Sequence, residues 1–274
     1  MENPVVSVIL PTYNRCNLLK KAIKSVYEQS FTDWEIVVID SQSTDGTNIY
    51  LNKLAAEDDR IKYFDIPKKK TFIISEYLNF GIEVSKGKYL ARLDDDDVWC
   101  DGDKLKEQVE FLDSNPEYVL IGAGSICVDA NDNEMSRCIK KETDSRIRKF
   151  ALLACPFDHP TIMVRKSTLD KIGGYKNIHA EDTEFFLRLG TAGKLHNFQK
   201  YYVRYLQDGK GISNKTEKET ALSELRIHKM YRNYYPNYYI SYILTGFQYL
   251  YTFLPFFIRK KLHYRIRHIK RKYF

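Results

Sequence analysis

Four consecutive aspartates follow an apolar run in the segment LARLDDDDVW, residues 90–99. Adjacent carboxylates repel one another unless a positive charge lies among them. One interpretation is an ordinary solvated acidic turn. The other is a metal site, because the run directly follows a buried strand and an extended chain would point Asp94 and Asp96 to the same side. Two such carboxylates can hold Mn²⁺ or Mg²⁺ through oxygen and leave coordination positions open for a diphosphate.

Two other groups of carboxylates also have a structural and a functional interpretation. Asp40 ends the apolar segment WEIVVID, so it either caps the next helix or hydrogen-bonds the base or ribose of a nucleotide. Glu181 and Asp182 either open the first turn of a helix or include a general base, since a partly buried carboxylate near others has a raised pKa. His159 is either a structural hydrogen-bonding residue or part of the wall of the site.

Alternating strands and helices must position these residues. Apolar runs with few polar interruptions predict buried strands at 5–10, 34–40, 60–66, 88–93 and 118–129. Apolar residues at helical spacing predict helices capped by Asn17, over 48–58, 72–87, 104–116 and 145–155, and from Glu181. The connections are too long for hairpins, which favours an α/β fold with a mostly parallel sheet flanked by helices. Ligands bind at the carboxyl ends of such strands, so 11–15, 40–45 and 94–97 should face one crevice.

Composition limits the class of protein. The chain has 274 residues, of which 43% are hydrophobic, enough for a sizeable core. The opening MENPVVSVIL has no basic segment followed by a long apolar one, which predicts no secretory signal. Five scattered cysteines without a CxxC pair indicate reduced thiols, typical of the cytosol, and neither a disulfide framework nor a zinc site.

The charge is distributed unevenly along the chain. Eleven Lys or Arg residues and no acidic residue follow Glu224, so the first 224 residues carry 32 basic against 36 acidic side chains. Residues 238–258 are uncharged and include five tyrosines, and 259–274 place Leu262, Ile266, Ile269 and Tyr273 on one side of a basic helix. We expect this tail to lie on an anionic membrane surface. The alternative is an aromatic helix packed on the body. Nucleic-acid binding is disfavoured, because the body has no matching motif.

The motifs together resemble family 2 glycosyltransferases, which are inverting enzymes of the GT-A fold. VSVILPTYNRCNLLKKAIKSVYEQSFTDWEIVVIDSQSTDGT is similar to their opening, and SKGKYLARLDDDDVWCDGDKLKEQV is similar to their D-x-D region. HPTIMVRKSTLDKIGGY followed by AEDTEFFLRL resembles their acceptor-side segment. The ordered match covers roughly residues 5–195. It implies a GT-A-like catalytic domain at 1–210, followed by a helical, aromatic and basic segment at 211–274.

The resemblance also implies roles for individual residues. Asp182 would be the catalytic base with Glu181 beside it, and Asp40 would contact uracil. The remaining nucleotide-binding residues would be Pro11, Thr12, Tyr13, Arg15, Asp94 and Asp95. The ligands of Mn²⁺ or Mg²⁺ would be Asp94, Asp96 and Asp97. This chain departs from the family pattern at Ser41, where a second Asp is common, and at Leu78, where an Arg is usual. The nearest basic candidates to replace that Arg are Lys68, Lys69 and Lys70.

The function implied is metal-dependent transfer of a sugar from a nucleotide-sugar, UDP-linked by expectation, to a saccharide hydroxyl with inversion. The acceptor is expected to be lipid-linked and used in surface polysaccharide synthesis, at the cytoplasmic face of the plasma membrane. Two alternatives remain at this point. One is a catalytically silent nucleotide-sugar-binding subunit at the membrane, and the other is a glycoside hydrolase, which also uses paired carboxylates.

Overall fold

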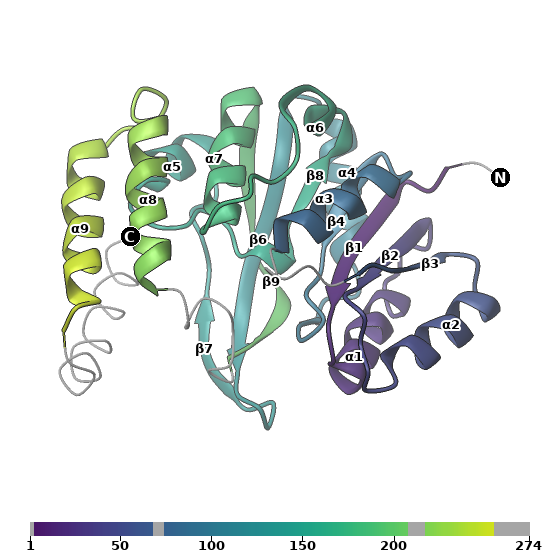
Figure 1. Ribbon diagram of the computed structural model, residues 1–274. Coiled ribbons are helices and arrows are strands. Elements are labelled where there is room, and N and C mark those ends of the chain that lie inside the picture. Colours follow the sequence, from purple (N-terminus) through teal and green to yellow (C-terminus); the bar gives the residue numbers. More distant parts are fainter. Residues whose placement is uncertain (1–2, 68–73, 208–216, 255–274) are drawn as a thin grey trace.

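The computed structural model describes residues 3–67, 74–207 and 217–254 (Figure 1). Within these residues one nine-stranded sheet has the strand order β3-β2-β1-β4-β8-β6-β9-β5, with β7 paired to β6 outside this path. The strands are β1 (Val6–Thr12), β2 (Trp34–Asp40), β3 (Ile61–Asp65), β4 (Tyr89–Arg92), β5 (Val98–Trp99), β6 (Tyr118–Val128), β7 (Glu134–Cys138), β8 (Met163–Arg165) and β9 (Lys194–Leu206).

Helices cover both faces of the sheet. They are α1 (Cys16–Tyr27), α2 (Thr47–Glu57), α3 (Ile74–Val84), α4 (Lys104–Ser114), α5 (Asp144–Phe150), α6 (Lys166–Ile172), α7 (Glu181–Ala192), α8 (Glu217–Tyr231) and α9 (Tyr238–Tyr251), with a short 3₁₀ turn at His159–Thr161. Val8 of β1 packs with α1, α2 and α4, whereas its neighbour Ile9 packs with α3, α6 and α7. The central strands are apolar on both faces for this reason, as the sequence predicts.

The predicted α/β fold is confirmed. Strands β3, β2, β1 and β4 are all parallel, and Thr12 is paired with Asp40, so the ends of β1 and β2 lie side by side. β6 and β9 are also parallel. Every antiparallel pair involves one of the short strands β5, β7 or β8. The loops that follow β1, β2 and β4 therefore share one edge of the sheet.

Two local predictions differ from the structure. Helix α1 begins at Cys16 with Arg15 as its N-cap residue, rather than after Asn17, because the Arg15 carbonyl accepts the N–H groups of Leu18 and Leu19. The long strand β9 was not anticipated from its sequence, KLHNFQKYYVRYL, whose polar residues show no simple alternation. It pairs with β6 and brings Leu206 next to the acidic run.

The C-terminal helices pack in succession on the outside of the molecule (Figure 1). Tyr231 and Tyr235 from the α8 region pack with Leu187 of α7 in a separate hydrophobic cluster, and α9 packs on α8 as the outermost helix. None of the helices in the described residues is long and apolar enough to cross a membrane. The predicted basic amphipathic helix at 259–274 and Lys68, Lys69 and Lys70 lie outside the described residues.

Candidate active site

The loops after β1 and β2 are joined by hydrogen bonds into one rim. The Asn14 amide donates to Ser43 Oγ at 2.8 Å, and the Thr44 amide donates to Asn14 Oδ1 at 2.7 Å. The Cys16 amide donates to Asp45 Oδ2 at 2.9 Å. The predicted nucleotide-pocket residues follow one another along this rim: Pro11 and Thr12 are buried, and Tyr13 and Arg15 are half-buried.

Asp40 lies beneath this rim and is fully buried. Its carboxylate accepts hydrogen bonds from the Ser43 amide at 3.1 Å, from Ser43 Oγ at 2.5 Å and from the Tyr63 hydroxyl at 3.4 Å. It does not cap the next helix, because Gly46 is the N-cap residue of α2. The expected contact of Asp40 with a uracil base stays a prediction; both bonds from Ser43 go to Oδ1, and Oδ2 accepts only the long bond from Tyr63.

The two departures from the family pattern have clear structural positions. The Ser41 hydroxyl lies 2.9 Å from the hydroxyl of Tyr77, so it is engaged within the fold. Leu78 is fully buried in the hydrophobic core between β1, β2 and α3. Neither position therefore presents a charged group to the rim.

The four aspartates form a turn, which corrects the expectation of an extended chain. The Asp97 amide donates to the Asp94 carbonyl at 3.2 Å, so simple alternation of side chains does not apply. Asp95 points back to the β1 loop, where its carboxylate accepts from Thr12 Oγ1 at 2.8 Å and from the Tyr13 amide at 3.4 Å. Asp95 thus fixes the nucleotide-side loop to the acidic run.

Two arginines neutralise part of this acidic turn. Arg15 Nη1 lies 3.1 Å from Asp95 Oδ1 and 2.5 Å from Asp96 Oδ2. Arg92, the last residue of β4, forms an ion pair with Asp94. Sequence reasoning missed Arg92. The available signal was a single cation inside an otherwise apolar strand that immediately precedes the aspartates.

The acidic turn fits a divalent cation. Asp97 is 1% exposed, and its Oδ2 atom has no hydrogen-bond partner among the described residues. Burial and the charge of Asp94 raise the pKa of Asp96 to about 6, and burial together with Asp94 and Asp96 raises the pKa of Asp97 well above its ordinary value. Hard carboxylate oxygens crowded in this way suit Mg²⁺ or Mn²⁺.

The chain does not build a closed metal cage at this position. No group of three or more His, Cys, Asp or Glu side chains within the described ranges is arranged to enclose a metal ion. A cation held by one or two carboxylates does not need such a cage, because water and substrate phosphates complete its coordination. The residues that could hold it are Asp94, Asp96 and Asp97.

Glu181 and Asp182, the predicted general base and its neighbour, are the first two residues of helix α7, which begins at Glu181 as expected. Asp182 Oδ1 accepts from the Thr183 amide at 2.6 Å. Burial raises the pKa of Asp182, and burial together with the Asp182 charge raises the pKa of Glu181 to about 7. The charge of Asp94 contributes to the raised pKa of both carboxyls, so the start of α7 lies within electrostatic range of the acidic turn.

Half-buried His159 and buried Tyr175 form a hydrogen-bonded pair that packs against α7. His159 Nε2 is 2.7 Å from the Tyr175 hydroxyl, and Tyr175 stacks on Phe185 of α7. Burial and the nearby Arg92 charge lower the pKa of His159 to about 3, so its imidazole is neutral. Asp94 also acts on it electrostatically. His159 is therefore a structural hydrogen-bonding residue, and its place in the wall of the site stays a prediction.

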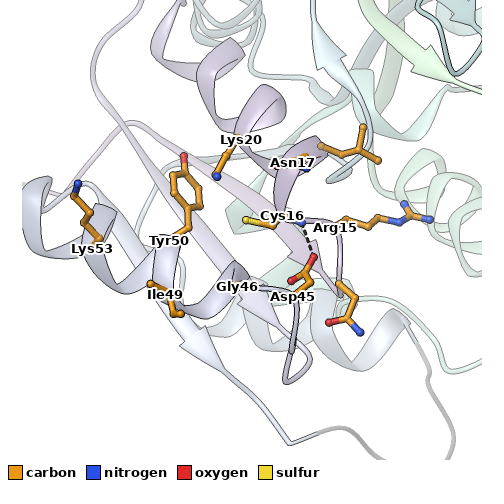
Figure 2. A pocket seen from close by; sticks show the side chains of 11 residues that line it. Arg15, Cys16, Asn17, Lys20, Asp45, Gly46, Ile49, Tyr50 and Lys53 are labelled. Carbon is orange, nitrogen blue, oxygen red and sulfur yellow. Dashed lines mark hydrogen bonds between the residues drawn. The ribbon is translucent and has the colours of Figure 1, made fainter.

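A surface pocket of about 680 Å³ lies next to this site, between the starts of α1 and α2 (Figure 2). Lys20, Tyr50 and Lys53 line it, and Arg15 lies at its edge. Neither the acidic turn nor the Glu181–Asp182 pair is part of its lining. The pocket is thus separate from the groups that could do chemistry, and only Arg15 contributes to both.

Comparison with known proteins agrees with this geometry. The family model described as "Glycosyl transferase family 2" matches residues 7–173. The chain is 29% identical over 236 residues to the Campylobacter jejuni protein named GalNAc(5)-diNAcBac-PP-undecaprenol beta-1,3-glucosyltransferase. The match covers 84% of this chain and 75% of that protein.

Two solved structures share the fold. The mannosyltransferase PcManGT of Pyrobaculum calidifontis, in complex with GDP-Man and Mn²⁺, has a TM-score of 0.64 at 17% identity, covering 92% of this chain and 71% of that one. TarS 1–349 of S. aureus, in complex with UDP-GlcNAc, has a TM-score of 0.63 at 19% identity, covering 82% and 64%. At these identities the likeness establishes the fold alone.

Proposed function

The chain belongs to glycosyl transferase family 2, and on this premise we propose that it transfers a sugar from a UDP-linked donor to a saccharide hydroxyl with inversion. The observation that carries the proposal is that the acidic turn lies within electrostatic range of the Glu181–Asp182 pair, while His159 bonds to Tyr175 and Tyr175 stacks on Phe185 of the same helix as that pair. One side supplies groups for a nucleotide diphosphate and the other supplies a base. The glycoside hydrolase alternative leaves the acidic turn unexplained and is not pursued.

On the donor side, the β1 and β2 loops would hold the nucleotide, and Asp94, Asp96 and Asp97 would hold Mn²⁺ or Mg²⁺. When bound, such a cation supplies positive charge to the departing diphosphate. The two solved structures support this assignment, since TarS 1–349 is a complex with a UDP-sugar and PcManGT is a complex with GDP-mannose and Mn²⁺. The fixed position of Asp95 against Thr12 and Tyr13 would keep the nucleotide loop aligned with the cation site.

On the acceptor side, Asp182 would take the proton from the attacking hydroxyl. Its burial disfavours the charged form and makes the carboxylate a better base than one in open water. The acceptor oxygen then attacks the anomeric carbon from the face opposite the diphosphate. This single displacement inverts the configuration, so an α-linked donor gives a β-linked product.

UDP release from the purified protein tests the proposal. With a panel of UDP-sugars and lipid-diphosphate saccharides, we expect release that needs both one donor and one acceptor. EDTA should abolish it, and added Mn²⁺ or Mg²⁺ should restore it. Binding of UDP and Mn²⁺ without turnover across the panel would favour the catalytically silent subunit. Metal-independent turnover would contradict the cation site.

The pH dependence of turnover follows from the raised pKa values of Glu181 and Asp182. Below about pH 7 Glu181 retains its proton, and because the pKa of Asp182 is raised as well, the two neighbouring carboxyls share that proton and a smaller fraction of Asp182 is ionised to act as a base. We therefore expect turnover to rise as the pH increases through about 7. Glu181→Gln removes the neighbouring charge, so turnover in this variant should rise at a lower pH. If turnover rises at the same pH as in the wild type, another group controls the pH dependence.

The same pair affects stability in the opposite direction. Because the pKa of each carboxyl is raised in the folded protein, the folded state binds these protons more tightly than the unfolded chain does. Their contribution to the free energy of unfolding therefore falls as the pH rises from the ordinary value of Glu, 4.5, towards 7. Activity and this part of the stability change in opposite directions across that window.

We further propose a lipid-linked acceptor and peripheral attachment to the cytoplasmic face of the plasma membrane, in surface polysaccharide synthesis. The name of the C. jejuni relative, which contains a diphosphate-linked undecaprenol saccharide, supports this acceptor class. Helix α9 supports the attachment, because it buries Ser241 and Thr245 while Ile243 and Phe247 face outward. An outward apolar face followed by a basic chain end suits an anionic lipid surface.

Vesicle binding tests the attachment. The Ile243→Ser/Phe247→Ser variant removes two side chains that are 58% and 67% exposed, so its folding should be unaffected. We expect about tenfold weaker co-sedimentation with phosphatidylglycerol vesicles. Ile49→Ser is the matched control, since Ile49 of α2 is 74% exposed on a different part of the surface. Equal binding by all three proteins would contradict a role for α9.

A further inference from the structure

The two arginines of the acidic turn are held in different ways. Arg92 is 5% exposed, and in addition to its ion pair with Asp94 it donates to the backbone carbonyls of Ile9 and Leu93. These carbonyls belong to the sheet and to the residue that follows β4. Arg92 is therefore fixed by groups that stay in place whatever occupies the site.

Arg15 has no such backbone anchor. Its side chain is 34% exposed, and among the described residues its guanidinium bonds only to Asp95 and Asp96, both through Nη1. Carboxylates alone hold it in position. A divalent cation competes for carboxylates of this kind, so this arginine can be displaced while Arg92 cannot.

Its two partners differ in what they retain when Arg15 leaves. Asp95 keeps the hydrogen bonds from Thr12 Oγ1 and the Tyr13 amide, so its carboxylate stays satisfied. Asp96 loses the one cationic partner that it has within the described part of the chain, and it becomes available to a metal ion. The metal ion thus supplies the positive charge that Asp96 loses when Arg15 leaves.

The freed side chain is well placed for a phosphate. Arg15 is the N-cap residue of α1, on the loop that follows β1, and its neighbour Asn14 is joined to the β2 loop. Figure 2 shows its side chain extending away from Lys20 and Lys53, which line the adjacent pocket. A guanidinium offers several N–H donors in a planar fork that matches phosphate oxygens, which a lysine does not.

We propose that Arg15 is an exchangeable counter-ion of the donor site. It neutralises Asp96 until a divalent cation binds there, and it then moves to the diphosphate of the nucleotide. The inference rests on the proposed function, since it takes the nucleoside diphosphate and the cation as the ligands. It predicts that removing Arg15 has opposite effects on the two ligands, which neither a purely structural nor a purely nucleotide-binding role predicts.

Binding measurements without acceptor test the exchange. Mn²⁺ affinity is read from the electron paramagnetic resonance signal of free Mn²⁺, with no nucleotide present. UDP affinity is read by calorimetry at saturating Mn²⁺. We expect Arg15→Gln to bind Mn²⁺ alone about fivefold more tightly, because the competing ion pair is gone. We expect it to bind UDP about tenfold more weakly, because a charged hydrogen-bond donor is lost.

Two further variants separate the exchange from a general charge effect. Lys20→Gln removes one positive charge from the same helix without touching an aspartate, and it should change Mn²⁺ affinity less than about twofold. Arg15→Lys keeps the charge, so its Mn²⁺ affinity should stay near that of the wild type while UDP affinity falls. If Arg15→Gln changes the affinities for Mn²⁺ and UDP in the same direction, the proposed exchange is wrong. If the wild-type protein binds neither Mn²⁺ nor UDP, the proposed function itself fails.

Discussion

Asp182→Asn should lower the rate of sugar transfer by about 10²- to 10⁴-fold, the range expected when a general base is removed. The asparagine amide has nearly the same shape as the carboxylate but cannot accept the proton of an attacking hydroxyl. Its Oδ1 can still accept from the Thr183 amide, as Asp182 does at 2.6 Å, so helix α7 should begin as before. The loss should therefore appear in turnover and not in folding.

Donor binding separates this role from damage to the whole site. Among the described residues the Asp182 carboxylate hydrogen-bonds only to Thr183 and to no predicted nucleotide-binding residue, so the affinity for UDP with Mn²⁺ should stay within about twofold of the wild type. Single-turnover UDP release in the presence of acceptor gives the rate. Glu181→Gln is the matched control, and it should retain most of the activity above pH 8. Loss of less than tenfold in Asp182→Asn would show that the base lies elsewhere.

The largest effect on stability should come from Glu184, two residues further along the same helix. This carboxylate is fully buried, and it accepts hydrogen bonds from Arg188 at 3.1 Å, from Lys176 Nζ at 2.7 Å and from the Tyr231 hydroxyl at 2.6 Å. Although burial alone would raise its pKa, these bonds hold the pKa below the ordinary value. This stabilisation is present above the ordinary pKa and is lost as the pH falls through the lowered one.

Glu184→Gln should lower the free energy of unfolding by about 3–5 kcal/mol, because it leaves Arg188 and Lys176 without their counter-ion. For a chain of this length that corresponds to a melting temperature lower by about 10 °C. Glu110→Gln, at an exposed position of α4, is the control and should change the stability by less than about 0.5 kcal/mol. Thermal unfolding of both variants followed by circular dichroism checks this. Equal melting temperatures would mean that the network contributes little.

The central strands and the start of helix α7 could be predicted from the sequence for simple reasons. A strand buried on both faces is a continuous apolar run, and β2 accordingly spans all seven residues of WEIVVID. The apolar spacing of Phe185, Phe186 and Leu189 required a helix with Glu181 in its first turn. The sequence itself places carboxylates at the ends of these elements, and the family resemblance implies their roles.

Other features depended on distant parts of the chain and could not be predicted in this way. Arg92 can be buried because its guanidinium donates a hydrogen bond to the carbonyl of Ile9, which is 83 residues away in the chain. The aspartates form a turn that receives a bond from the Leu206 amide, at the end of a strand with no clear periodicity. Local propensity carries no information on either contact. The roles of Asp94 to Asp97 therefore had to stay open at the level of the sequence.

The attachment of α8 to α7 determines what proteolysis could release from this chain. A cut in α9, beyond Asn237, would detach the outward apolar face and leave Tyr231 on Glu184 and Tyr235 on Leu187. A cut at residue 210, the predicted domain boundary, would remove both tyrosines and uncover Ala151, Leu152 and Leu187. The first cut would yield an intact fragment that no longer carries the proposed membrane-binding face. The second cut would yield a fragment whose hydrophobic cluster is exposed to solvent. We therefore expect the smallest catalytic unit that folds on its own to include α8, beyond the predicted boundary at 210.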